Sequence, residues 1–355
     1  MTRTFRAILI TGLFLFGCAT DGTVTQKTEK MIVKVESSEK HDELVERLKT
    51  LERSVFTLRS ELSILEYRLK NIHPRLPLAS YKIPAEVFLC GERIPLEDKN
   101  VRENLDREFL VGLGNESQII LWMKRARRYF PYIEKRLKEL DLPDDLKYVT
   151  ITESSLRPNA VSSSGASGIW QFIPSTGEKF GMRKNRILDE RFDFFKSTEG
   201  ALTYLKSLYE EFRSWTLSMA AYNCGENRVR REIEFQRTKD YFHLDLPTET
   251  KRYVYKIAVA KILLSNPGRY GFHIEENEFY DPLRFERVQV ELTRPLSLLD
   301  VATSIGCFYK EIKEMNPHLM EDAVPPGRHV LNLPPGTSGQ FRAFFSVWEK
   351  GLENK

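Results

Sequence analysis

Hydrophobic and polar positions divide the 355-residue chain into segments of different periodicity. Between residues 44 and 72, leucines and other apolar residues recur at alternating spacings of four and three, which predicts a helix with one narrow apolar seam. This pattern is typical of a coiled coil, here over residues 41–73 and after a polar tether at 18–40. An amphipathic helix that folds back on its own domain is the alternative. Whether a coiled coil would pair with a second copy or with another protein stays open.

The rest of the chain predicts a mostly α fold. Prolines predict a semi-rigid linker over residues 74–86, and residues 87–280 then carry apolar positions at helical spacing with few strand-like runs. Pro131 predicts a break in one of these helices. Residues 284–336 follow the order strand, helix, helix, strand, which predicts a small α+β module before a tail at 337–355.

The N-terminus has the features of an export signal over residues 1–17. Two arginines precede an apolar run at residues 7–16, which is too short to span a bilayer comfortably, and a glycine precedes Cys18. The sequence of residues 15–18, LFGC, resembles a bacterial lipobox. This resemblance implies a lipid on Cys18, which would anchor the rest of the chain to a membrane. Ala19 resembles the outer-membrane class, so we expect the periplasmic face of that membrane. Ordinary signal cleavage that leaves Cys18 as a thiol is the alternative.

Composition excludes some functions. The net charge of +4 is mild and the chain lacks dense basic tracts, so we expect no nucleic-acid partner. The six histidines form no ligand-spaced pair, so we expect no metal and no other cofactor. Apart from Cys18, the cysteines are Cys90, Cys224 and Cys307, an odd number, so at least one thiol stays free. We expect all three to be small buried apolar residues.

One stretch carries the candidate chemistry: TITESSLRPNAVSSSGASGIWQFIPSTGEKFG, residues 150–181. Glu153 lies at the end of a predicted helix, and no Asp or Glu follows until Glu178. Apolar neighbours on both sides of the motif predict a partly desolvated carboxyl group with a raised pKa, as a general acid requires. The alternative is a solvated glutamate near a helix end, which the helix dipole disfavours slightly.

That stretch, AAYNCGENRVRR at 220–231 and LPTETKRYVYKI at 246–257 together resemble the signature blocks of the soluble lytic transglycosylase (SLT) domain family. The preceding RRYFPYIEKRLKELDLPDDLKYV is similar to the membrane-bound lytic murein transglycosylase D branch. The resemblance implies a lysozyme-like helical fold and peptidoglycan glycan strands as the substrate. It also implies cleavage of the MurNAc-β-1,4-GlcNAc bond with a 1,6-anhydromuramyl product.

The resemblance also implies roles for individual residues. Glu153 would act first as acid and then as base, while the sugar's 2-acetamido group and C6 hydroxyl replace the second carboxylate that most glycosidases need. Ser162, Gln171 and Ile173 would contact sugar.

Further site residues follow from the two later blocks. Tyr222 and Asn223 would face Glu153, and Glu249 and Tyr253, four apart on one helical face, would line the cleft. Either tyrosine could instead be a core aromatic with a satisfied hydroxyl. We expect Trp170 to be a core residue rather than a platform for sugar.

The C-terminal module resembles a LysM peptidoglycan-binding module, although TRPLSL replaces its usual Gly-Asp turn. Two roles remain open for this module: it could bind glycan, or it could serve as a structural cap on the catalytic domain. For the whole chain, two alternatives to lytic transglycosylation remain. These are a wall-binding scaffold without turnover and a muramidase that releases reducing ends.

Overall fold

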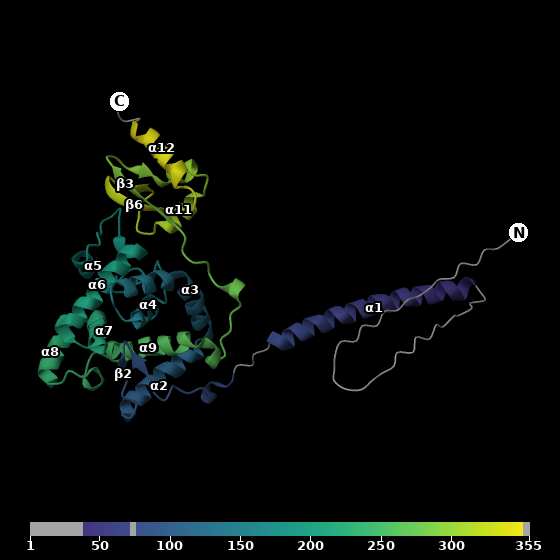
Figure 1. The fold of residues 1–355 in the computed structure, drawn as a ribbon, viewed down its shortest axis with the longest axis horizontal. Helices are drawn as coiled ribbons and strands as arrows, with labels where there is room; N and C mark the ends of the chain where they lie inside the picture. The colour runs from purple at the N-terminus through teal and green to yellow at the C-terminus, as the bar shows by residue number, and fades with distance from the viewer. Residues whose placement is uncertain (1–37, 72–75, 351–355) are drawn as a thin grey trace. The chain divides into compact units, whose positions relative to one another are not determined.

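The structure, a computed structural model, describes residues 38–71 and 76–350 (Figure 1). These residues belong to two compact units that divide between Ile72 and His73. The predicted signal peptide, Cys18 and most of the tether lie outside the described residues, so their roles stay predictions. Among the helices that the structure describes, none combines the length and the apolar composition that a bilayer crossing requires.

The first unit contains the long helix α1, Ser38–Asn71, of 34 residues. This helix covers nearly all of the segment with the alternating apolar pattern. Leu44, Leu51 and Leu58, which belong to the predicted seam, are exposed on α1. The seam is the surface that pairing in a coiled coil would cover.

The second unit begins with a helical domain, which confirms the mostly α prediction. Its strands β1 and β2 form a short antiparallel pair. The elements are β1 (Phe88–Leu89), β2 (Glu92–Arg93), α2 (Lys99–Gly114), α3 (Glu116–Glu139), α4 (Val149–Ser154), α5 (Pro174–Lys179), α6 (Phe194–Phe212), α7 (Trp215–Cys224), α8 (Glu226–Gln236) and α9 (Thr248–Ser265).

Helix α9 forms the centre of this domain. It packs against α2, α4 and α7, and its side chains from Tyr253 to Tyr255 and from Ile257 to Ala260 are buried. Helix α2 approaches closely at Gly112, where a β-carbon would lie 3.2 Å from Cγ1 of Val259. Because α4 and α7 both contact α9, residues from three separate sequence blocks meet at one place.

The C-terminal module has the predicted order strand, helix, helix, strand, with an added pair of short strands and a final helix. Strands β3 and β6 pair antiparallel with Val290 opposite His329, and Phe341 of the final helix is buried in the module's core. The elements are β3 (Glu286–Leu292), β4 (Leu296–Ser297), α10 (Leu298–Ser304), α11 (Tyr309–Met315), β5 (Ala323–Val324), β6 (Gly327–Leu333) and α12 (Ser338–Lys350).

A loop of the helical domain, residues 183–189, is built into this module. The backbone N–H of Asp189 donates to the carbonyl of His318 at 2.9 Å, and that of Met320 donates to the carbonyl of Ile187 at 2.8 Å. Leu188 is buried in the hydrophobic core of the module. These contacts support the interpretation of the module as a structural cap, while glycan binding by it stays a prediction.

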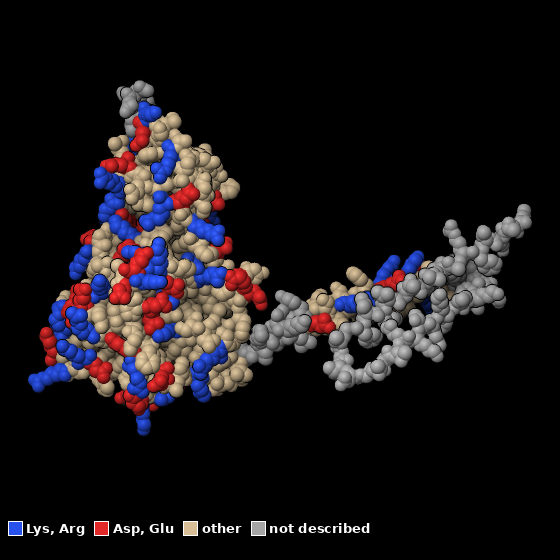
Figure 2. Space-filling view, viewed as in Figure 1, with Lys and Arg blue, Asp and Glu red and all other residues tan. Residues whose placement is uncertain are grey.

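Charged side chains of both signs intermix on the face shown in Figure 2. Lysines and arginines alternate with acidic residues over the helical domain and over the module, and no broad area of that face carries one sign alone. This distribution agrees with the mild net charge of +4.

Candidate active site

Glu153 is the penultimate residue of α4, and the backbone on both sides of it is fixed. Val149 and Ile151 anchor the helix in the core. The helix ends abruptly because Ser155 and Leu156 both take left-handed conformations, with φ of 55° and 57°. Non-glycine residues adopt this conformation only where the surroundings impose it. Glu153 is therefore held at a defined place on a short, rigid element.

Tyr253 of α9 donates a hydrogen bond from its hydroxyl to Oε1 of Glu153. Burial raises the pKa of Glu153 to about 7, and the negative charge of Glu249 contributes in the same direction. The Tyr253 hydrogen bond and the charge of Lys256 act against that shift. A carboxyl group with a pKa near neutrality can both donate and accept a proton at physiological pH, as an acid/base catalyst must.

The α9 residues that act on Glu153 occupy one helical face. Glu249, Tyr253 and Lys256 stand at positions i, i+4 and i+7, and each contributes to the pKa of Glu153. The sequence motifs predicted Glu249 and Tyr253 as site residues but not Lys256. Its helical spacing from the other two was the signal that could have found it.

Residues 169–171 are hydrogen-bonded to several helices beside the site. Ser154 Oγ donates to the carbonyl of Ile169 at 2.8 Å, and the Tyr222 hydroxyl of α7 donates to the carbonyl of Trp170 at 2.8 Å. The indole N–H of Trp170 donates to Thr198 of α6 at 3.0 Å. Trp170 has no exposed surface, so its prediction as a core residue is confirmed.

Tyr222 and Asn223 lie where α7 meets the candidate site. Burial, and to a smaller extent the charge of Glu153, raise the pKa of Tyr222 well above its usual value. The Oδ1 atom of Asn223 accepts a hydrogen bond from the Thr250 hydroxyl at 2.7 Å. That bond fastens the end of α7 to the first turn of α9.

The predicted sugar-contacting residues lie on the loop after α4, and most of their polar atoms are used within that loop. Gln171, with φ of 52°, donates from Nε2 to the carbonyls of Ala160 and Gly168 at 3.1 and 2.7 Å. Ser162 Oγ accepts from the Ala166 N–H at 3.0 Å. Ile173 is 43% exposed and precedes α5. Their contact with sugar stays a prediction.

A buried ion pair, which no sequence motif predicted, holds this loop in place. Arg191 pairs with Asp189 at 2.6 Å, and its NH1 donates to the carbonyls of Gly165 and Phe172, both at 2.8 Å. The backbone of Arg191 also packs directly on Gly168, where a β-carbon would lie 2.1 Å from the Arg191 carbonyl oxygen. Gly168 has φ of +81°, so both space and conformation require glycine here.

In the part of the chain that the structure describes, no group of three or more His, Cys, Asp or Glu side chains could hold a metal ion. Cys90, Cys224 and Cys307 are free thiols in these residues and are partly buried.

Comparison with known proteins agrees with this geometry. Residues 131–244 match the family model of the Transglycosylase SLT domain, a span that includes Glu153 and Tyr222. Membrane-bound lytic murein transglycosylase D of Escherichia coli (strain K12) is 33% identical over 225 residues, which are 62% of this chain. A putative tributyltin chloride resistance protein of Alteromonas sp. (strain M-1) is 35% identical over 34% of this chain and 59% of its own. The aligned region spans 48% of the Escherichia coli protein, about half of its length.

Among solved structures, the 70 kDa soluble lytic transglycosylase of Escherichia coli aligns with 51% of this chain and 33% of its own, at 20% identity and a TM-score of 0.34. The family-model match rests on sequence and covers the motifs around Glu153 and Tyr222. By sequence, residues 131–244 of this chain therefore match the Transglycosylase SLT domain family.

Proposed function

We propose that the chain is a lytic murein transglycosylase that cleaves the MurNAc-β-1,4-GlcNAc bond of peptidoglycan and leaves a 1,6-anhydromuramyl end. The proposal rests mainly on the carboxyl group of Glu153, which accepts a hydrogen bond from the Tyr253 hydroxyl. Burial raises the pKa of this carboxyl group to about 7. The SLT domain match and the printed names of the relatives support the same reaction class.

In the proposed reaction, protonated Glu153 gives its proton to the glycosidic oxygen as the bond to the muramic acid anomeric carbon breaks. The carbonyl of the sugar's 2-acetamido group stabilises or bonds that carbon. Ionised Glu153 then takes the proton of the C6 hydroxyl. At the same time the C6 oxygen bonds to the anomeric carbon and displaces the acetamido oxygen. Both nucleophiles belong to the substrate, so intramolecular attack replaces a free water. Glu153 gives one proton to the oxygen of the leaving sugar and regains another from the C6 hydroxyl, so the enzyme is unchanged at the end of the reaction.

Tyr253 and the helix ends hold Glu153 for both proton transfers. The Tyr253 hydroxyl bonds to Oε1, which fixes the rotation of the carboxyl group and leaves Oε2 for the substrate. We propose that Ser162, Gln171, Ile173 and Asn223 contact the sugars beside it. Gln171 uses Nε2 within its own loop, so its Oε1 is the atom left for a substrate amide or hydroxyl.

The hydrolytic alternative would require a second carboxylate as base for a water molecule, and Glu249 is the candidate for it. Glu249 lies near enough to Glu153 to raise its pKa, and it is exposed. Inverting glycosidases hold their two carboxyl groups about 6.5–9.5 Å apart with a water between them. We assign Glu249 to substrate binding, because the proposed reaction needs no second base.

The expected cellular setting is the periplasmic face of the outer membrane. A lipid on Cys18 would anchor the chain there, and the seam of α1 would bind a second copy or another envelope protein. The names of two relatives, membrane-bound lytic murein transglycosylases D and C, support association with the cell envelope.

The proposal is tested by digesting purified sacculi with the full chain and measuring the masses of the released muropeptides. Lytic transglycosylation yields anhydro ends, which lack one water and do not react with borohydride. Reducing ends would instead identify a muramidase. No release at all, from protein whose thermal melting shows that it is folded, would identify a non-catalytic scaffold.

Replacing Glu249 by Gln separates the two enzymatic mechanisms. We expect cleavage within about threefold of wild type and an unchanged anhydro product, since removing an auxiliary charge has a modest effect. If Glu249 were the base of a hydrolase, its loss would lower the rate by roughly 10²-fold or more. Product masses and initial rates on the same sacculi give both readouts.

The pH dependence of cleavage should follow the pKa of Glu153. We expect kcat/KM to fall as the pH rises through about 7, because the acid form is lost. Tyr253→Phe removes a hydrogen bond that favours the ionised form, so the alkaline limb should move to higher pH. Glu249→Gln removes a negative charge that favours the protonated form, so the limb should move to lower pH. Shifts of the same sign in both variants would contradict this assignment.

A further inference from the structure

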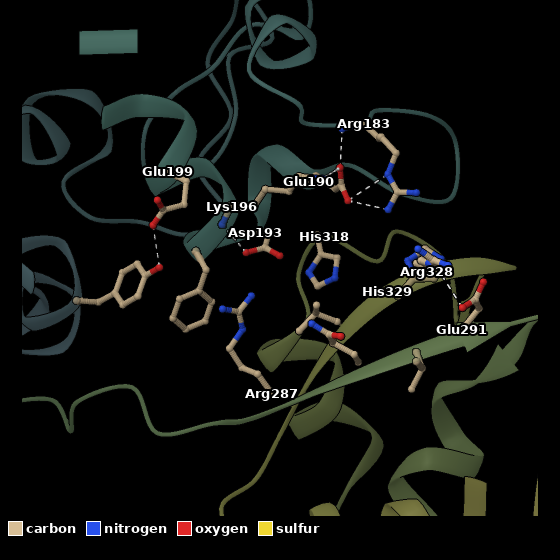
Figure 3. A pocket seen from close by; sticks show the side chains of 15 residues that line it. Arg183, Glu190, Asp193, Lys196, Glu199, Arg287, Glu291, His318, Arg328 and His329 are labelled. Atoms are coloured by element: carbon tan, nitrogen blue, oxygen red, sulfur yellow. Dashed lines mark hydrogen bonds and ion pairs between the residues drawn. The ribbon is translucent and has the colours of Figure 1, made fainter. Parts of the chain in front are cut away.

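A pocket of about 750 Å³ lies between the helical domain and the C-terminal module. The helical domain contributes its loop around residue 190 and the start of α6, and the module contributes β3, β6 and the loop that carries His318 (Figure 3). This volume is within the usual range for small-molecule sites, which is about 300–1,000 Å³. The pocket is separate from Glu153, which does not line it.

Several acidic groups of this pocket are already satisfied by cations. The carboxylate of Glu190 accepts from Arg183 at 2.8 Å and from Lys196 at 2.5 Å. That of Glu199 accepts from Arg136 at 2.6 Å and from the Tyr132 hydroxyl at 3.1 Å. These groups build the walls and have little capacity left for a ligand.

Three other groups keep unused capacity, as far as the described residues show. The buried ring of His318, only 4% exposed, has no hydrogen-bond partner at Nδ1. Asp193 uses Oδ1 to cap α6 through the Lys196 N–H at 3.0 Å, which leaves Oδ2. Arg287 lies over the ring of Phe195 at 4.3 Å and forms no ion pair within the described residues. Figure 3 shows Asp193 and Arg287 pointing toward the space beside His318.

An unpartnered buried imidazole is unusual, because burying a polar group without a hydrogen bond is unfavourable. One free anion, one free cation and one free ring nitrogen around one space suit a ligand that has both charges close together. A simple anion would be repelled by the carboxylate of Asp193, and a simple cation would be repelled by the guanidinium of Arg287. An α-amino acid head group, with ammonium and carboxylate on one carbon, satisfies both.

We propose that this junction pocket binds an α-amino acid head group, with its ammonium against Asp193 and its carboxylate against Arg287. Free amino acids and the un-cross-linked diamino acid of a peptidoglycan stem peptide share this chemistry. We assign the stem peptide as the natural source, and that assignment rests on the proposed function. The pocket adjoins the loop of Asp189 and Arg191, so a bound stem would lie against the segment that holds Gly165 and Phe172.

The test is calorimetric titration of the full chain with free diaminopimelic acid. The comparison ligands are pimelic acid, which lacks both ammonium groups, and cadaverine, which lacks both carboxylates. We expect diaminopimelic acid to bind at least about tenfold more tightly than either, because each comparison ligand leaves one charged side chain unpaired. No binding, or equal binding of the three ligands, would overturn the proposal.

Variants locate the site. Arg287→Gln and Asp193→Ser should each weaken binding about tenfold or more, and serine keeps a hydroxyl that can cap α6. The matched control is Arg294→Gln, because Arg294 lies over Trp348 at the same 4.3 Å but outside the pocket. An Arg287→Gln variant that binds like wild type would exclude this pocket as the site.

Competition identifies the source of the ligand. A muropeptide with an intact stem should displace diaminopimelic acid, whereas a peptide-free glycan strand should not. Failure of the muropeptide to compete would overturn the stem-peptide assignment. This binding is measured without turnover, so it can fail while sacculi still yield anhydro products. Conversely, Arg287-dependent binding without any anhydro product would reject only the proposed function.

Discussion

Glu153→Gln is expected to lower the rate of glycan-strand cleavage by about 10³-fold or more. General acid/base catalysis contributes typically 10²–10⁴-fold, and here one side chain serves both proton transfers. Glutamine has nearly the same shape and can still accept the hydrogen bond of Tyr253, but it can neither give nor take a proton at neutral pH. The rate is measured as muropeptide release from sacculi. A variant that kept more than a tenth of wild-type activity would contradict the assignment.

The control for this variant is Glu178→Gln, which neutralises the next carboxylate along the chain. Glu178 is exposed on α5, so we expect its loss to leave activity within about twofold of wild type.

Thermal melting provides a second control for Glu153→Gln. Because folding raises the pKa of Glu153 from 4.5 to about 7, wild-type stability should decline as the pH rises through this window. Glu153→Gln has no carboxyl group to ionise at this position and therefore lacks this loss of stability. At pH 8 it should be at least as stable as wild type.

Arg191→Met is expected to cost about 3–5 kcal/mol of folding stability, because it leaves the Asp189 carboxylate buried without its partner. It also removes both hydrogen bonds to the loop carbonyls of Gly165 and Phe172. A loss of this size lowers Tm by on the order of 10 °C in a domain of this size. Cleavage should fall together with stability, since the loop beside Glu153 loses its support.

Arg186→Met is the matched control, since Arg186 lies on the same connection between α5 and α6 and pairs with Glu321 of the module. Both partners of that pair are largely exposed, and such pairs contribute about 0–1 kcal/mol. Differential scanning calorimetry of the two variants gives the comparison. If both melted within about 2 °C of wild type, the buried Arg191–Asp189 pair would not stabilise the fold as expected.

Several elements could be predicted from the sequence because their signals are local. The spacing of apolar residues predicted α1, and the succession of strand-like and helical runs predicted the order of the module. Pro131 was misleading, because α3 continues through it from Glu116 to Glu139. A proline inside a helix costs about 3 kcal/mol, and the buried side chains of Phe130, Ile133 and Leu137 offset that loss.

The candidate site was predictable only where a motif named its residues. Glu153, Tyr222 and Tyr253 come from three such blocks, and the structure brings them together through α4, α7 and α9. The support of the site was not predictable in this way. Arg191 and Asp189 look like ordinary surface charges in the sequence, and their burial follows from how the loop packs between the helical domain and the module.

The central claim is that Glu153 remains protonated near neutral pH, and titration of its carboxyl group tests that claim most directly. Glutamate labelled with ¹³C at the side-chain carboxyl gives one resonance for each residue, and the signal missing in Glu153→Gln identifies Glu153. We predict a midpoint at about pH 7 for that resonance. A midpoint near the ordinary glutamate value of about 4.3 would contradict the claim, because the acid form would then be scarce at the pH of the cell envelope.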